Sequence, residues 1–179
     1  MDFQFKSISI EKDHVGVVFC DSKNRLIGHG KKLDQISKKA ISSVINNDLS
    51  FQKRKSKSFD YSIVHAPNNL KLAKLYVFKL SDLSKYTLRD YQILGGHLFS
   101  LISFYQEDKV GFYLDGIVSK GISAVNVASE IILGSLLASY KFDKYKTVNK
   151  KEKKTLKVKI YSANHSRIEK NLSLIHISE

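Results

Sequence analysis

Residues 123–147, SAVNVASEIILGSLLASYKFDKYKT, most constrain what this chain can fold into. Their apolar side chains recur every three to four positions, which predicts an α-helix capped by Ser123. Because further apolar residues widen the stripe, we expect the helix to be buried between a sheet and a second element. Gly134 lowers helix propensity by about 1 kcal/mol relative to Ala, which indicates that another backbone packs closely there. The stripe consists of Val125, Ala128, Ile132, Leu136 and Tyr140, widened by Ile131, Leu133 and Leu137.

Short apolar runs punctuate the rest of the chain and predict β-strands. The run 15–20 is apolar throughout, as in an interior strand. Lys157 and Lys159 alternate with apolar residues, which indicates a half-exposed strand and is compatible with a sheet edge protected by the lysines. We expect the third and fourth strands, which flank the turn at 66–69, to pair with each other. Strands are predicted at residues 3–10, 15–20, 59–65, 72–80, 110–114 and 156–160.

Two further helices are predicted from periodicity and capping signals. Residues 33–47 place their apolar side chains on one face and lysines on the other, which indicates one amphipathic helix covering a sheet. Thr87 and Asp90 have the spacing of a capping box, with Tyr86 and Tyr91 as its hydrophobic staple. The Gly95-Gly96 pair in the following helix again suggests the close approach of a neighbour. A short terminal helix is plausible after residue 164.

Six or so strands interleaved with three helices predict an α/β, three-layer fold, with a mixed β-sheet and helices on both faces. A length of 179 residues suits one domain with a real core. The single cysteine, Cys20, excludes an internal disulfide framework and is expected to be a small buried hydrophobe. The chain has neither a signal-peptide pattern nor an uncharged run long enough for a membrane span, so we expect a cytoplasmic protein without a membrane partner.

The formal net charge of +13 raises the possibility of a nucleic-acid partner. The excess comes from Lys rather than from Arg, whose planar fork suits phosphates and guanine better. A solvated surface is therefore favoured over a dedicated phosphate-binding face. The residues that would form such a basic surface are Lys53, Arg54, Lys55, Lys57, Lys150, Lys151, Lys153 and Lys154.

The aromatic and basic string at the end of the organising helix is more specific than helix periodicity requires. It resembles the last helix of the N-terminal domain of leucyl aminopeptidases, the two-metal M17 peptidases. The resemblance covers about residues 1–172 and is strongest over 87–147. It implies a macro-domain-like fold whose order of elements agrees with the one predicted above. The residues of the signature are Glu130, Gly134, Tyr140, Phe142, Tyr145 and Lys146.

The resemblance also implies a division of the chain and of its chemistry. Residues 1–163 correspond to the N-terminal domain and 164–179 to the start of a connection, with residues 173–179 fitting the family poorly. The family binds two divalent ions, Mn or Zn, in a C-terminal catalytic domain and assembles as a hexamer. No segment here matches its metal-binding pattern, so the chain inherits no catalytic residue, no metal ligand and no cofactor. It is expected to be inactive alone and to serve assembly and substrate access, with exposed apolar surface.

Two alternatives for a binding function remain open. One is a nucleic-acid-binding module that uses the basic runs. The other is a macro-type binder of ADP-ribose or another nucleotide, centred on a loop that follows a strand and precedes a helix, the usual place for an anion site. That loop contains Asp115, Gly116 and Gly121 but matches no known phosphate-loop motif. The six histidines are scattered, without the spacing of a metal site.

Overall fold

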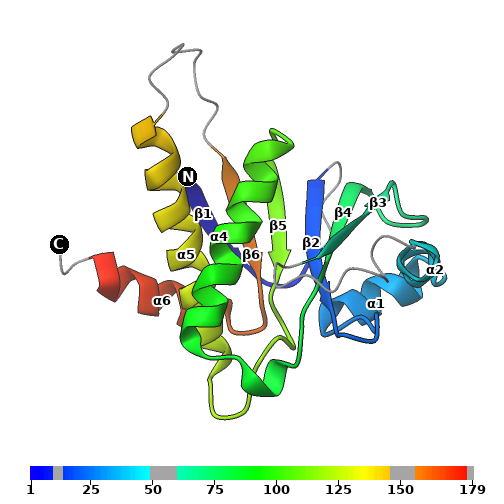
Figure 1. Ribbon diagram of the computed structural model, residues 1–179, viewed down its shortest axis with the longest axis horizontal. Helices are drawn as coiled ribbons and strands as arrows, with labels where there is room; N and C mark the ends of the chain where they lie inside the picture. The colour runs from blue at the N-terminus through cyan, green and yellow to red at the C-terminus, as the bar shows by residue number, and fades with distance from the viewer. Residues whose placement is uncertain (10–13, 49–59, 146–155, 177–179) are drawn as a thin grey trace.

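The computed structural model describes residues 1–9, 14–48, 60–145 and 156–176 (Figure 1). It is an α/β domain with one six-stranded sheet, as predicted. The strands are β1 (Asp2–Lys6), β2 (His14–Cys20), β3 (Tyr61–His65), β4 (Leu72–Lys79), β5 (Lys109–Tyr113) and β6 (Lys157–Tyr161). The helices are α1 (His29–Ile36), α2 (Ala40–Asn47), α4 (Leu88–Phe104), α5 (Ala124–Tyr145) and α6 (His165–His176), with a short 3-10 helix η1 (Leu83–Lys85).

The strands are ordered β1-β6-β5-β2-β4-β3. Five strands are parallel, and β3 pairs antiparallel with β4, which confirms both the mixed sheet and the predicted pairing of these two strands. The placement of β6 at a sheet edge was wrong, because β1 pairs with its outer side along Asp2–Lys6. An apolar–lysine alternation marks one solvated face, and it does not distinguish an edge strand from an interior one.

Helices α4, α5 and α6 cover one face of the sheet, where α4 and α5 lie side by side (Figure 1). The two long helices cross with their backbones nearly in contact. A Cβ atom built on Gly134 would lie 1.8 Å from the Gln92 carbonyl oxygen, and one on Gly95 would lie 2.0 Å from that of Ile131. The Ser135 hydroxyl donates to the carbonyl oxygen of Gly95 across this crossing. The predicted close approach is therefore confirmed at Gly134 and at Gly95. Gly134 on α5 lies against α4, and Gly95 on α4 lies against α5.

Helices α1 and α2 cover part of the opposite face. The prediction of a single helix over 33–47 is wrong, because α1 ends at Ile36 and a separate helix, α2, begins at Ala40. Lys38 and Lys39 both have positive φ angles, 55° and 63°, which no helix accommodates. Asp34 stabilises this corner, since its carboxylate accepts hydrogen bonds from the backbone N–H and the hydroxyl of Ser42. The apolar pattern continues from α1 into α2, so the pattern alone does not reveal the interruption between the two helices.

The capping predictions are confirmed. Thr87 and Asp90 form a reciprocal capping box at the start of α4, and the rings of Tyr86 and Tyr91 lie 5.4 Å apart. The Ser123 hydroxyl accepts from the backbone N–H of Asn126 at the start of α5. No helix in the described ranges is long and apolar enough to cross a membrane.

Candidate functional site

The carboxyl ends of the parallel strands meet at one edge of the sheet, which is where α/β folds usually bind ligands. Three loops lie together there, following β2, β5 and β6. The predicted anion loop, Asp115 to Gly121, is the middle one of the three. Its geometry decides what this edge of the sheet can bind.

Asp115 contacts the third loop through its carboxylate. Oδ1 accepts a hydrogen bond of 2.8 Å from the Ser162 hydroxyl, and both oxygens lie 3.2–3.3 Å from the backbone nitrogen of Ala163. Helix α6 begins two residues later, at His165. The Asp115 carboxylate therefore lies at the positive end of α6, where an anion is stabilised by unpaired N–H groups and by the helix dipole.

Gly28 closes the space between the first two loops. A Cβ atom built on Gly28 would lie 1.6 Å from the Asp115 carbonyl oxygen, and one on Gly116 would lie 2.7 Å from the Gly28 Cα. Gly28 has a φ of 52° and a ψ of −124°, a conformation that residues with a side chain essentially do not adopt. Gly121 also has a positive φ, 81°, but a Cβ there would meet nothing within 4 Å. The first two loops thus touch at Gly28 and Gly116, and Gly121 is needed only for its turn.

Three stacked rings lie below these loops, on the face that α1 covers. His29 stacks on Tyr113 at 5.0 Å, and Tyr113 stacks on Tyr161 at 4.8 Å. The Tyr113 hydroxyl donates to the carbonyl oxygen of Ser9. Burial lowers the pKa of His29, and Lys32 lowers it further, against an opposing effect of Asp115. Burial and Lys32 therefore both disfavour the protonated form of the His29 ring, which its isolated position in the sequence did not suggest.

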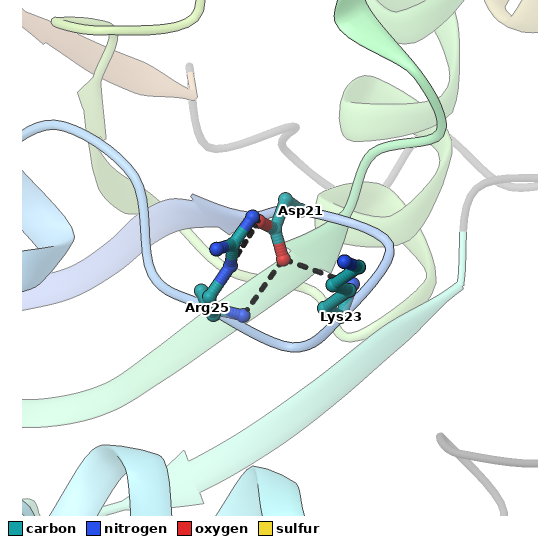
Figure 2. Close-up of polar contacts among 3 residues, drawn as sticks. All are labelled: Asp21, Lys23 and Arg25. Atoms are coloured by element: carbon teal, nitrogen blue, oxygen red, sulfur yellow. Dashed lines mark hydrogen bonds and ion pairs between the residues drawn. The ribbon is translucent and has the colours of Figure 1, made fainter.

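The turn after β2 is closed by Asp21 (Figure 2). One carboxylate oxygen accepts from the backbone N–H groups of Lys23 and Arg25, and the other contacts the Arg25 guanidinium at 2.7 Å. These hydrogen bonds and the Arg25 charge lower the pKa of Asp21 against the opposing effect of its burial, which is the largest single contribution. The carboxylate is thus engaged on both oxygens by its own turn.

Five of the six signature residues lie on α5. Gly134 is buried in the helix crossing, Glu130 is half-buried and Tyr140 is 74% exposed. Phe142 and Tyr145 belong to α5, but their side chains lie outside the described part of the structure, as does Lys146 altogether. The expectation that Tyr140 belongs to a stripe buried on both sides was wrong. Within the described residues, no second layer covers this end of the helix.

Exposed apolar side chains occur on both of the long helices. Leu137 on α5 is 50% exposed, close to Tyr140 in the same helix. On α4, Phe104 is 76% exposed and Ile93 is 45% exposed. Large apolar side chains that stay exposed on helices already covering a sheet favour an interaction surface.

The eight residues of the predicted basic surface all lie outside the described ranges. A different group of lysines lies within the described residues. Lys109, Lys157 and Lys159, with Gln4, line a cavity of about 210 Å³ on the sheet face opposite α4 and α5. The register places Lys109 directly beside Lys157, and β-strand alternation alone did not reveal this neighbour.

Metal-ligating side chains are dispersed over the described residues. These contain no group of three or more His, Cys, Asp or Glu side chains that could hold a metal ion. Cys20 is fully buried at the end of β2, as predicted.

The amino-acid sequence of this chain is similar to those of known proteins. Residues 17–149 match the family described as "Cytosol aminopeptidase family, N-terminal domain". The "Probable cytosol aminopeptidase" of Rickettsia bellii (strain OSU 85-389) is 33% identical over 141 residues, which cover 77% of this chain and 27% of that protein. The corresponding protein of Agrobacterium fabrum is 35% identical over 112 residues, 60% of this chain and 22% of that protein.

Solved structures show the same fold. A tomato leucine aminopeptidase mutant, K354E, superposes with a TM-score of 0.64 at 17% identity, over 97% of this chain and 35% of that one. The Oceanobacillus iheyensis macrodomain mutant D40A superposes with a TM-score of 0.66 at 12% identity, over 99% of this chain and 93% of that one. The macro-domain-like, three-layer fold is therefore confirmed.

Proposed function

Because this chain belongs to the cytosol aminopeptidase family and matches its N-terminal domain, we propose that it serves as a non-catalytic domain of a metal-dependent leucyl aminopeptidase. The chain spans about a quarter of the length of the curated relatives it matches. In this proposal the parent enzyme releases N-terminal amino acids from peptides as a hexamer. The domain itself serves assembly and access of substrate to a C-terminal catalytic domain.

The observation that carries this proposal is the exposure of Leu137 and Tyr140 on α5. Large apolar and aromatic side chains are typical of the centre of a protein–protein interface. Leu137 and Tyr140 lie within one helical turn of each other on α5, so one partner surface can contact both. Such a surface is expected of a domain that packs against a larger partner.

The two divalent ions of the proposal, Mn or Zn, do not fit the described residues of this chain. A two-metal site needs several carboxylates brought together, and the described residues bring no such group together. The proposal therefore places the metals in the catalytic domain and gives the described residues no catalytic step.

A direct test is the activity of the purified 179-residue chain. We expect no hydrolysis of leucine amide with Mn²⁺ or Zn²⁺ added. Metal-dependent hydrolysis that survives repurification and disappears with a chelator would overturn the proposal.

A second test measures docking. The chain is mixed with the catalytic domain of the Rickettsia bellii relative, produced without its own N-terminal domain, and the complex is followed by analytical ultracentrifugation. We expect Leu137→Asp and Tyr140→Asp each to weaken the complex by about tenfold or more. The matched control is Ile36→Asp on α1, since Ile36 is similarly exposed but lies on the opposite layer. An equal loss in all three variants, or no complex with the unsubstituted chain, would contradict the proposed surface.

Nucleic-acid binding is the second candidate, and the lysine-lined cavity favours it. Lys109, Lys157 and Lys159 place three cations on one sheet face, in a chain of net charge +13. Binding through these groups would weaken steeply with salt, because each neutralised phosphate releases counterions. We expect Lys109→Glu with Lys157→Glu to reduce both the affinity for a DNA duplex and its salt dependence. The matched control is the double variant Lys31→Glu with Lys32→Glu. If Lys109→Glu with Lys157→Glu bound the DNA duplex as tightly as this control does, this sheet face would not be the binding site.

A further inference from the structure

Strand β3 forms one end of the six-stranded sheet, with β4 on its inner side (Figure 1). Among the described residues, no strand pairs with its outer side. An end strand is a template for further strand pairing, which folds commonly prevent with charged side chains, proline or a bulge. Tyr61–His65 contains no Asp, Glu, Lys, Arg or Pro, and its register with β4 is regular throughout. The sequence of β3 therefore leaves this edge of the sheet unprotected.

The pairing with β4 determines which backbone groups of β3 point outward. Just before β3, the carbonyl oxygen of Asp60 accepts from the N–H of Lys79. Just after it, the N–H of Ala66 donates to the carbonyl oxygen of Ala73. Because backbone groups alternate in direction along an antiparallel strand, the even-numbered residues of β3 bond to β4. The N–H and C=O groups of its odd-numbered residues, with Ile63 at the centre, therefore point to the outer side.

A cavity lies beside this edge, on the side of α2. It has a volume of about 610 Å³, and α2 and β3 both contribute to its lining. Ser62 and Ile63 line it from β3, and Val44 lines it from α2. The Val44 side chain is 39% exposed, so it offers an apolar contact to the side chains of a strand added beyond β3.

Strand β3 is complementary to a second copy of itself. In an antiparallel pairing centred on Ile63, the two Ile63 residues stand opposite each other, and Tyr61 stands opposite His65 of the second copy. All of these residues are odd-numbered, so their outward backbone groups meet as hydrogen-bonded pairs. No side chain meets one of like charge, and aromatic and β-branched cross-strand pairs stabilise a sheet. Of the possible registers, this one alone pairs the whole of Tyr61–His65 with itself.

We propose that the chain forms a dimer through β3, in which two copies join their sheets around a two-fold axis at Ile63. Such an interface uses the same surface of both copies, and main-chain hydrogen bonds supply much of its affinity. The dimer surface lies on an end strand of the sheet, whereas the proposed docking surface lies on α5. Neither depends on the other, and a chain that stays monomeric would leave the docking experiment unaffected.

Amide hydrogen exchange of the unsubstituted chain, followed by NMR at increasing protein concentration, tests the pairing. The N–H groups of Ser62 and Val64 bond to β4 and should exchange slowly at every concentration. Those of Ile63 and His65 should exchange rapidly in dilute solution and about tenfold more slowly once sedimentation equilibrium shows a dimer. A chain that is monomeric at every concentration, or a dimer in which these two groups still exchange rapidly, would overturn the proposal.

A charge exchange at Ile63 tests the two-fold axis. Ile63→Lys and Ile63→Glu each place like charges opposite one another, so each should weaken its own dimer by about tenfold. When the two variants are mixed, opposite charges face each other and a heterodimer should form. Dimerisation of either variant alone at the unsubstituted affinity, or no recovery on mixing, would contradict the axis.

The same substitutions at His65 are the matched control. His65 stands opposite Tyr61 rather than opposite itself, so His65→Lys and His65→Glu should not repel within their own dimers. Mixing these variants should bring no gain in affinity. A gain equal to that at Ile63 would show that general charge attraction, and not strand pairing, drives association. If the Ile63 variants do not fold, the hydrogen exchange of the unsubstituted chain decides alone.

Discussion

Gly134 lies so close to Gln92 that a Cβ atom built on it would be 1.8 Å from the Gln92 carbonyl oxygen. The neighbouring atom belongs to the backbone of α4, so no side-chain rotation can make room. We expect Gly134→Ala to separate the two helices and to lower the free energy of unfolding by about 3 kcal/mol, as overpacked cores do. Urea denaturation followed by circular dichroism measures the change.

Gly96 provides the matched control for this prediction. It lies in the same crossing, but its nearest neighbours to a built Cβ are 3.8 and 3.9 Å away, an ordinary contact. Gly96→Ala should therefore raise the stability by up to about 1 kcal/mol through helix propensity alone. If both alanine variants changed stability in the same direction, close backbone approach would not be the reason for Gly134.

Lys39 has a φ of 63°, in the left-handed region that costs a residue with a side chain roughly 1 kcal/mol. Lys39→Gly should relieve this strain and stabilise the protein by about 0.5–1 kcal/mol. The same substitution at Lys32, inside α1, should destabilise it by about 1 kcal/mol. Thermal unfolding of the two variants gives the signs. Destabilisation by Lys39→Gly comparable to that of Lys32→Gly would contradict the strain argument.

His29 should make stability depend on pH. Its pKa in the folded protein is lowered, mainly by burial and then by Lys32, so the unfolded chain binds the proton more readily. The contribution of His29 to stability is therefore complete above its unfolded pKa of about 6.5 and is lost as the pH falls from there through the folded pKa.

His29→Phe isolates this effect, because phenylalanine preserves the stack on Tyr113 without titrating. The stability of the unsubstituted protein relative to this variant should fall between pH 7.5 and pH 5.5. Denaturant titrations at the two pH values provide the comparison. A difference in stability that is the same at both pH values would mean that protonation of His29 does not affect folding.

Cys20 should be chemically silent in the folded protein. It has no exposed surface, and burial raises the pKa of its thiol to about 12 against an opposing effect of Lys79. Since only the thiolate attacks a disulfide, reaction with Ellman's reagent at pH 8 should be slow and should follow global unfolding. In guanidinium chloride one thiol per chain should react at once. Rapid labelling under native conditions would show that the end of β2 opens locally.

Most of the fold could be predicted from the sequence because its signals are local. A few neighbouring residues are enough to recognise the capping box at Thr87, the cap at Ser123 and the glycines of α4 and α5. The break after α1 was missed because Lys38 and Lys39 are ordinary helix residues by propensity. The corner that contains their positive φ angles is stabilised by Asp34, which accepts hydrogen bonds from Ser42 eight residues away.

The candidate site was harder to foresee because it depends on contacts between distant loops. The prediction of an anion loop at Asp115 and Gly116 depends on their position after a strand, and both residues do follow β5. Nothing in the sequence pairs Asp115 with Ser162, 47 residues later, or Gly28 with Gly116. Spacing therefore located the loop but could not reveal that the chain fills it. The exposure of Leu137 and Tyr140 was likewise hidden, because an apolar stripe does not show which partner covers it.

The neighbour of β1 has a consequence for biosynthesis. Asp2–Lys6 pairs with Lys157–Tyr161, so β1 has no neighbouring strand until residues 157–161 have been made. Strands β2, β3 and β4 can pair with one another as soon as residue 79 has emerged, and β5 joins them later. During that interval the hydrogen-bonding edge of β1 is unpaired, a condition that favours chaperone capture or aggregation. Completion of the sheet therefore waits until residue 161 has been made.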